Sequence, residues 1–202
     1  MDRAVIFRPK KIRAEQAMKL MHPSDSLTVM NEMVLPNDTN PLHNLRGGRL
    51  LHWMDICAAM SAQKHARAVC VTAAVDNVAF EHPIRLGHVV NIVSKVVRAF
   101  RTSMEVYIEV FCEDLKTGSR MKSNEAFYTF VALPQEGETQ PPALPELLPV
   151  TDEEKRLYDY SLIRKQYKLL SAGKISLRDA PQLQEQFERW MEQAQSSTES
   201  RH

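Results

Sequence analysis

Apolar and polar residues alternate with the period of β-strands along much of residues 25–133. In the segment 103–114, one face carries Met104, Val106, Ile108, Val110 and Cys112, as expected for a half-buried strand. Similar segments predict further strands at about 26–35, 69–80, 87–101 and 120–133. Because the last four strands follow one another through short links, we expect them to form an antiparallel sheet.

A different pattern begins at Gly47 and continues to about Arg67, where nearly all sides of a predicted helix are apolar. The apolar positions are Leu50, Leu51, Trp53, Met54, Ile56, Cys57, Ala58, Ala59, Met60 and Ala62. A helix of this kind has to be enclosed, and its small residues allow a sheet to approach closely. One helix wrapped by an antiparallel sheet predicts an α+β fold.

The chain outside this pattern divides into an N-terminal arm and a C-terminal extension. We expect an arm at residues 1–24, a main domain at 25–150 that ends in a proline-rich crossing segment, and a helical extension at 151–202. Thr151 and Glu154 match a capping box, Gly173 is a predicted stop, and a second helix is expected from about Pro181. This extension is interpreted as an oligomer contact, a lid or a packing appendage.

Composition excludes several classes of function. The chain has 26 basic and 25 acidic side chains, which gives no support for a nucleic-acid-binding protein. No apolar run approaches the roughly 18 residues of a membrane span, and no signal peptide is recognisable at the N-terminus. The odd, widely spaced cysteines Cys57, Cys70 and Cys112 favour a reducing compartment. We therefore expect a cytoplasmic protein.

Asp55 is the most informative candidate for chemistry because it lies within the apolar helix. A buried carboxylate is costly unless it has a partner or a function. Asp55 follows Gly48 by seven residues, so it lies on the same face as the helix start, about 10 Å along the axis. Free N–H groups at Gly47 and Gly48 would stabilise an oxyanion there, and Asp55 would activate a water. From these residues alone, a structural hydrogen-bonding role for Asp55 remains open.

Five segments follow one another along the chain: Leu35 to Ala62, Val71 to Asp76, Phe80 to Gly87, Thr102 to Val106 and Phe127 to Leu133. In this order they resemble segments of the hot-dog acyl-CoA thioesterases, a group that includes the bacterial YciA-type enzymes and the brain acyl-CoA hydrolase. The likeness covers roughly residues 27–150. The resemblance implies a hot-dog fold, with five antiparallel strands around a central helix, and hydrolysis of acyl-CoA thioesters.

The resemblance also implies an assembly and a set of site residues. It implies a homodimer with active sites at the dimer interface, often arranged as three dimers in a hexamer. The catalytic aspartate corresponds to Asp55, and a loop asparagine from the partner protomer corresponds to Asn40. Asn40 is also an ordinary turn residue before Pro41. The chain departs from the family pattern at His43, Arg46 and His88.

Basic and polar residues are expected along the path of the CoA moiety, with no metal and no cofactor beyond the CoA of the substrate. The candidates are Arg101, Thr102, Ser103 and Arg85, although each is equally consistent with a solvated edge. Two alternatives remain open, namely a non-catalytic acyl-CoA-binding module and a dehydratase that acts on hydroxyacyl thioesters.

Overall fold

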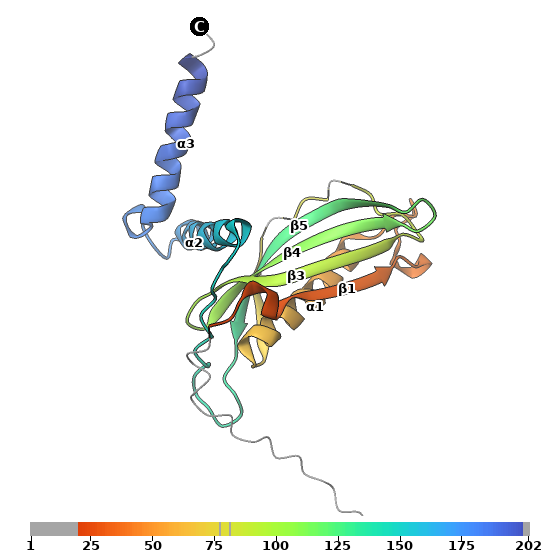
Figure 1. The fold of residues 1–202 in the computed structure, drawn as a ribbon, viewed down its shortest axis with the longest axis horizontal. Coiled ribbons are helices and arrows are strands. Elements are labelled where there is room, and N and C mark those ends of the chain that lie inside the picture. The colour runs from red at the N-terminus through yellow and green to blue at the C-terminus, as the bar shows by residue number, and fades with distance from the viewer. Residues whose placement is uncertain (1–19, 77, 81, 200–202) are drawn as a thin grey trace, which may run out of the picture. The chain divides into compact units, whose positions relative to one another are not determined.

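A computed structural model describes residues 20–76, 78–80 and 82–199, with side chains as far as residue 191. Five strands form one antiparallel sheet: β1 (Thr28–Met33), β2 (Cys70–Val75), β3 (Val89–Ala99), β4 (Ser103–Asp114) and β5 (Ser119–Ala132). Helix α1 (Gly47–Ala66) lies against one face of this sheet and contacts all five strands (Figure 1). The expected α+β hot-dog fold is therefore confirmed.

The order of the strands across the sheet is β1-β3-β4-β5-β2, so β1 and β2 form the two edges. Strand β4 begins and ends where its alternation predicts. Strand β2 is shorter than expected, because it ends at Val75 and the chain then leaves the sheet. The next residue, Asp76, still donates a backbone hydrogen bond to Phe127, and beyond it the ring of Phe80 lies against Gly47.

Helix α1 buries one half of its surface and exposes the other. The buried residues recur every three or four positions, as a helix on a sheet requires: Leu50, Trp53, Met54, Cys57, Ala58, Ser61, Ala62, His65 and Ala66. On the opposite side, Ile56 is 40% exposed and Met60 is 39% exposed. The expectation that α1 is enclosed on all sides is wrong for the single chain, because its sheet covers only one side of the helix.

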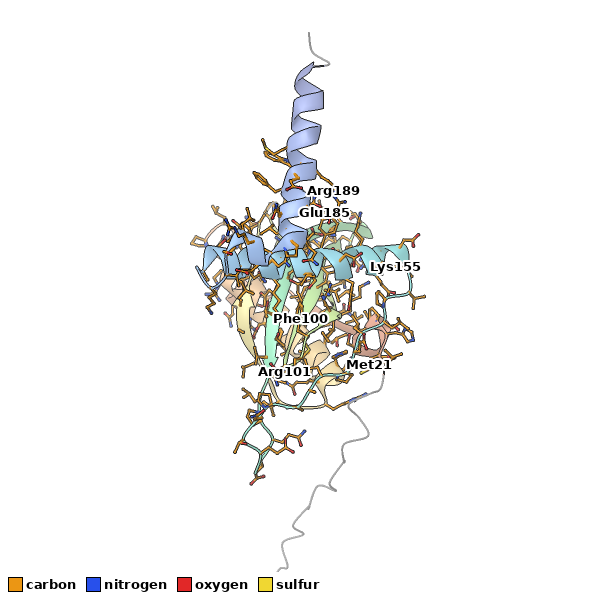
Figure 2. The ribbon with its side chains drawn as sticks, turned by 90° about the vertical axis from the view of Figure 1, so that its left-hand side faces the viewer. Met21, Phe100, Arg101, Lys155, Glu185 and Arg189 are labelled. Carbon is orange, nitrogen blue, oxygen red and sulfur yellow. The ribbon has the colours of Figure 1, made fainter. Side chains whose placement is uncertain are left out.

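The chain forms two compact units, one up to Leu148 and one from Pro149. The second contains α2 (Asp152–Ser171) and α3 (Pro181–Glu199), with the short helix η4 (Leu177–Asp179) between them. The predicted capping box is present at Thr151 and Glu154, and the chain turns after α2 at Gly173, whose φ is 66°. An ion pair joins Glu185 to Arg189 along α3 at 2.6 Å (Figure 2).

The arm predicted at residues 1–24 lies mostly outside the described residues; its last residues include the start of the short helix η2 (Pro23–Ser26). Among the helices of the described part, none is long and apolar enough to cross a membrane.

Candidate active site

The loop between β1 and α1 presents Asn40 in a fixed orientation. The carboxamide oxygen of Asn40 accepts hydrogen bonds from the backbone N–H groups of Leu42 at 2.9 Å and Asn44 at 3.1 Å. The backbone N–H of Asn40 donates to the carbonyl of Asn44 at 2.8 Å, which closes the loop on itself. Because backbone donors occupy the oxygen, the NH₂ group is the part of this side chain that is available to a ligand. The NH₂ group of Asn40 can therefore donate a hydrogen bond to a ligand.

The start of α1 is open to a ligand. Its N-cap residue, Arg46, makes no capping bond with its side chain, and the first turn contains no acidic residue. A Cβ atom at Gly48 would meet no described atom within 4 Å, whereas one at Gly47 would lie 3.2 Å from the ring of Phe80. The first N–H groups of a helix have no intrahelical acceptor and carry the positive end of the helix dipole. This end of α1 suits a developing negative charge.

A cavity of about 380 Å³ brings Asn40 and the helix start together. Its lining includes both polar and apolar residues. The lining residues are Asn40, Asn44, Leu45, Gly47, Leu50, Phe80, His82, Pro83, Ile84 and Asn124. The predicted residues Asn40 and Gly47 therefore line one cavity, whereas Gly48 and Asp55 are not among its lining residues.

Asp55 is half-buried near the middle of α1 and is held by a residue that the sequence analysis did not single out. The hydroxyl of Thr72, on edge strand β2, donates a hydrogen bond of 2.6 Å to its carboxylate. Such short bonds are typical of a hydroxyl facing an ionised carboxylate. Burial, and secondarily the charge of Asp55, raises the pKa of Tyr128 to about 12. No local sequence signal marks Thr72, because its partner lies on another element.

The four candidate CoA-binding residues lie in two separate places. Arg85 pairs with Asn44 in an isolated β-bridge, next to the loop that carries Asn40. Arg101 (Figure 2) and Thr102 lie in the turn between β3 and β4, and Ser103 is the first residue of β4. Since β3 begins opposite the end of β1, this turn lies at the far end of the sheet from Asn40. One chain does not bring the two groups together.

The described part of the chain contains no group of three or more His, Cys, Asp or Glu side chains arranged to hold a metal.

Residues 42–119 match the family model described as "Thioesterase superfamily". The chain is 38% identical over 140 residues to "Uncharacterized acyl-CoA thioester hydrolase YkhA" of Bacillus subtilis (strain 168). The aligned region covers 69% of this chain and 80% of that protein. The chain belongs to the thioesterase superfamily. It is also 41% identical over 146 residues, 72% of its length, to mouse "Acyl-coenzyme A thioesterase 11". The aligned region spans only 24% of the length of that mouse protein.

Solved structures of acyl-CoA hydrolases have the same fold as this superfamily member. The enzyme from Bacillus cereus is 35% identical with a TM-score of 0.72, over 77% of this chain and 94% of that one. The Staphylococcus aureus enzyme, solved with butyryl coenzyme A, coenzyme A and coenzyme A disulfide, is 30% identical with a TM-score of 0.66, over 91% of this chain and 100% of that one. Related Staphylococcus aureus structures carry alanine in place of an asparagine, an aspartate or a threonine.

Proposed function

We propose that this chain hydrolyses acyl-CoA thioesters, with Asp55 as the base that activates water. The observation that carries the proposal is the Asp55 carboxylate held by Thr72, on the same helix whose uncapped start opens into a cavity beside Asn40. These are the parts that thioester hydrolysis needs: a base, donors for an oxyanion and a space for the acyl group.

The solved relatives support this substrate and these residues. The Staphylococcus aureus acyl-CoA hydrolase binds butyryl coenzyme A. Its alanine variants replace an asparagine, an aspartate and a threonine at the same relative spacing along the chain as Asn40, Asp55 and Thr72. The same three residue types at the same spacing are expected where two chains share one catalytic arrangement.

The mechanism requires no cofactor and no metal. The thioester carbonyl oxygen accepts hydrogen bonds from the N–H groups at the start of α1 and from the NH₂ of Asn40. Asp55 takes a proton from water, whose oxygen attacks the carbonyl carbon. The tetrahedral intermediate collapses, the C–S bond breaks, and the CoA thiolate leaves and takes up a proton. Direct attack by the Asp55 carboxylate, through a mixed anhydride, is the alternative route to the same products.

We further propose that the complete site forms between two protomers. Strand β2 is an edge whose backbone is unpaired on one side in the single chain, and its side chains include the exposed Val71 and Val75. The exposed side of α1, with Ile56 and Met60, adds an apolar surface that a partner would cover. Pairing of two β2 edges about a two-fold axis would be antiparallel.

Such a pairing explains why the site is divided in one chain. It would set the Arg101–Ser103 turn of one protomer toward the Asn40 loop of its partner, and Asn40 toward the partner's Asp55-bearing helix. A solved relative that is 37% identical, with a TM-score of 0.72 over 77% of this chain and 98% of that one, is described as a hexameric acyl-CoA thioesterase. It supports a hexamer, which we propose is built from three such dimers.

The activity is tested by free-thiol release from acyl-CoAs of short, medium and long chain. We expect turnover by the wild type, loss of turnover in Asp55→Asn, and no change in Asp159→Asn, a matched control on α2. Full activity in Asp55→Asn would overturn the assignment. Binding of acyl-CoA without thiol release would indicate a binding module, and formation of enoyl-CoA would indicate a dehydratase.

The shared site is tested by co-expressing two inactive variants, Asp55→Asn and Asn40→Ala. A mixed dimer contains one site with both native residues, so activity returns if the site is shared. Co-expressed variants that associate and remain inactive would place both residues of each site on one chain.

A further inference from the structure

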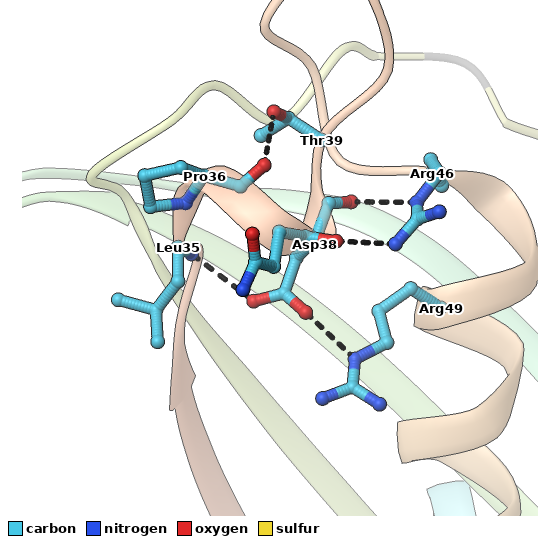
Figure 3. Close-up of polar contacts among 7 residues, drawn as sticks. Leu35, Pro36, Asp38, Thr39, Arg46 and Arg49 are labelled. Atoms are coloured by element: carbon cyan, nitrogen blue, oxygen red, sulfur yellow. Dashed lines mark hydrogen bonds and ion pairs between the residues drawn. The ribbon is translucent and has the colours of Figure 1, made fainter.

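Asp38 has a buried carboxylate that ties together three segments around the candidate site (Figure 3). Its side chain is 8% exposed. One carboxylate oxygen accepts a hydrogen bond from the backbone N–H of Leu35, two residues after the end of β1, at 3.1 Å. The other accepts Nε of Arg49, in the first turn of α1, at 2.8 Å. A buried carboxylate requires such partners, and here they lie on both sides of the loop that carries Asn40.

Arg46 closes the same loop by donating hydrogen bonds to backbone carbonyl groups (Figure 3). Its N–H donates to the carbonyl of Asp38 at 3.0 Å, and its guanidinium donates to the carbonyls of Asn37 and Asp38. Asn37 and Asp38 belong to the short helix η3 (Pro36–Asp38), which ends two residues before Asn40. The entry and exit of the loop are therefore joined directly at Asp38 and Arg46.

These contacts fix the distance between two groups of hydrogen-bond donors. Asn40 lies two residues after Asp38, and the open start of α1 lies immediately after Arg46. Both line the same cavity. Within the loop, the carboxamide oxygen of Asn40 is already bound by backbone N–H groups, so movement of the loop would move its NH₂ as well.

We propose that the Asp38–Arg49 ion pair is a positioning device that holds the NH₂ of Asn40 in register with the N–H groups at the start of α1. Asp38 and Arg49 act through Asn40 and the helix start and do not react themselves. This inference rests on the proposed hydrolysis. Displacement of a catalytic group by about 1 Å costs roughly 100-fold in rate, so an intact loop that is slightly displaced would be inefficient.

The test compares Asp38→Asn, Arg49→Met and the double variant in steady-state acyl-CoA hydrolysis. We expect kcat to fall about 10- to 100-fold in each single variant, with KM within about threefold of the wild type. Because the two side chains act through the ion pair that joins them, the double variant should lose no more than about twofold in kcat beyond the less active single variant. Arg189→Met, which breaks the exposed Glu185–Arg189 pair on α3, is the matched control and should keep full kcat.

Stability and the site assignment are measured alongside these variants. Arg49 is 42% exposed, so Arg49→Met is expected to fold, and it carries the test if Asp38→Asn does not. The inference is overturned if folded Arg49→Met keeps wild-type kcat, if only KM rises, or if the two substitutions act additively. Asp55→Asn is assayed in parallel: if it is inactive while Arg49→Met is normal, only the positioning role fails. If Asp55→Asn is fully active, the proposed hydrolysis itself fails.

Discussion

The hydrogen bond from Thr72 to Asp55 gives a sharp prediction for catalysis. Thr72→Val keeps the shape of the side chain and removes the donor that lies 2.6 Å from the carboxylate. A hydrogen bond to a charged group contributes about 1.5–3 kcal/mol, and each 1.4 kcal/mol corresponds to a factor of about ten in rate. If the bond holds the carboxylate in its reactive position, kcat/KM should fall about 10- to 150-fold.

Thr72→Ser is the control, since it keeps the hydroxyl and should retain most of the activity. The assay is thiol release at a fixed pH, together with urea unfolding to verify that both variants fold. Thr72 is solvent-exposed in the single chain, and valine has nearly the same shape as threonine, so we expect a small change in the free energy of unfolding. Wild-type kcat/KM in a folded Thr72→Val variant would refute the idea that this bond positions Asp55.

Three further predictions concern stability and reactivity. Burial raises the pKa of all three cysteine thiols, to about 11 for Cys70. At pH 8 the native protein should therefore react slowly with a thiol reagent, and the protein unfolded in urea should react rapidly. Rapid labelling of the native protein would contradict this prediction. Arg67 ends α1 with a φ of 51°, so Arg67→Gly should raise the free energy of unfolding by about 1 kcal/mol, and a loss in urea titration would contradict the strain argument. The pKa of Tyr128 is raised to about 12, so Tyr128 contributes stability that is complete below about pH 10 and is lost between about pH 10 and 12. In urea titrations across this range, Tyr128→Phe should therefore lose stability less steeply with pH than the wild type. An unchanged slope would contradict this prediction.

Much of the fold follows from local patterns. The alternation in 103–114 predicts β4 at its observed bounds, and the capping box at Thr151 predicts the start of α2. These predictions succeed because side-chain period and capping depend on residues a few positions apart. By contrast, the predicted strand 69–80 runs past Val75, because apolar residues such as Phe80 pack on the start of α1 after the chain has left the sheet.

The sequence by itself determined that one mostly apolar helix accompanies five strands. It also determined that Asp55 lies on the same face of this helix as the glycines at the start of the helix. Both results follow from helical and strand periodicity. Only the tertiary structure decided the strand order, the half of α1 that is buried, and the partners Thr72 and Arg49 of two acidic side chains. The reason is physical: Asp55 and Thr72, or Asp38 and Arg49, meet only after the chain has folded back on itself. Periodicity carries no information about which elements then become neighbours.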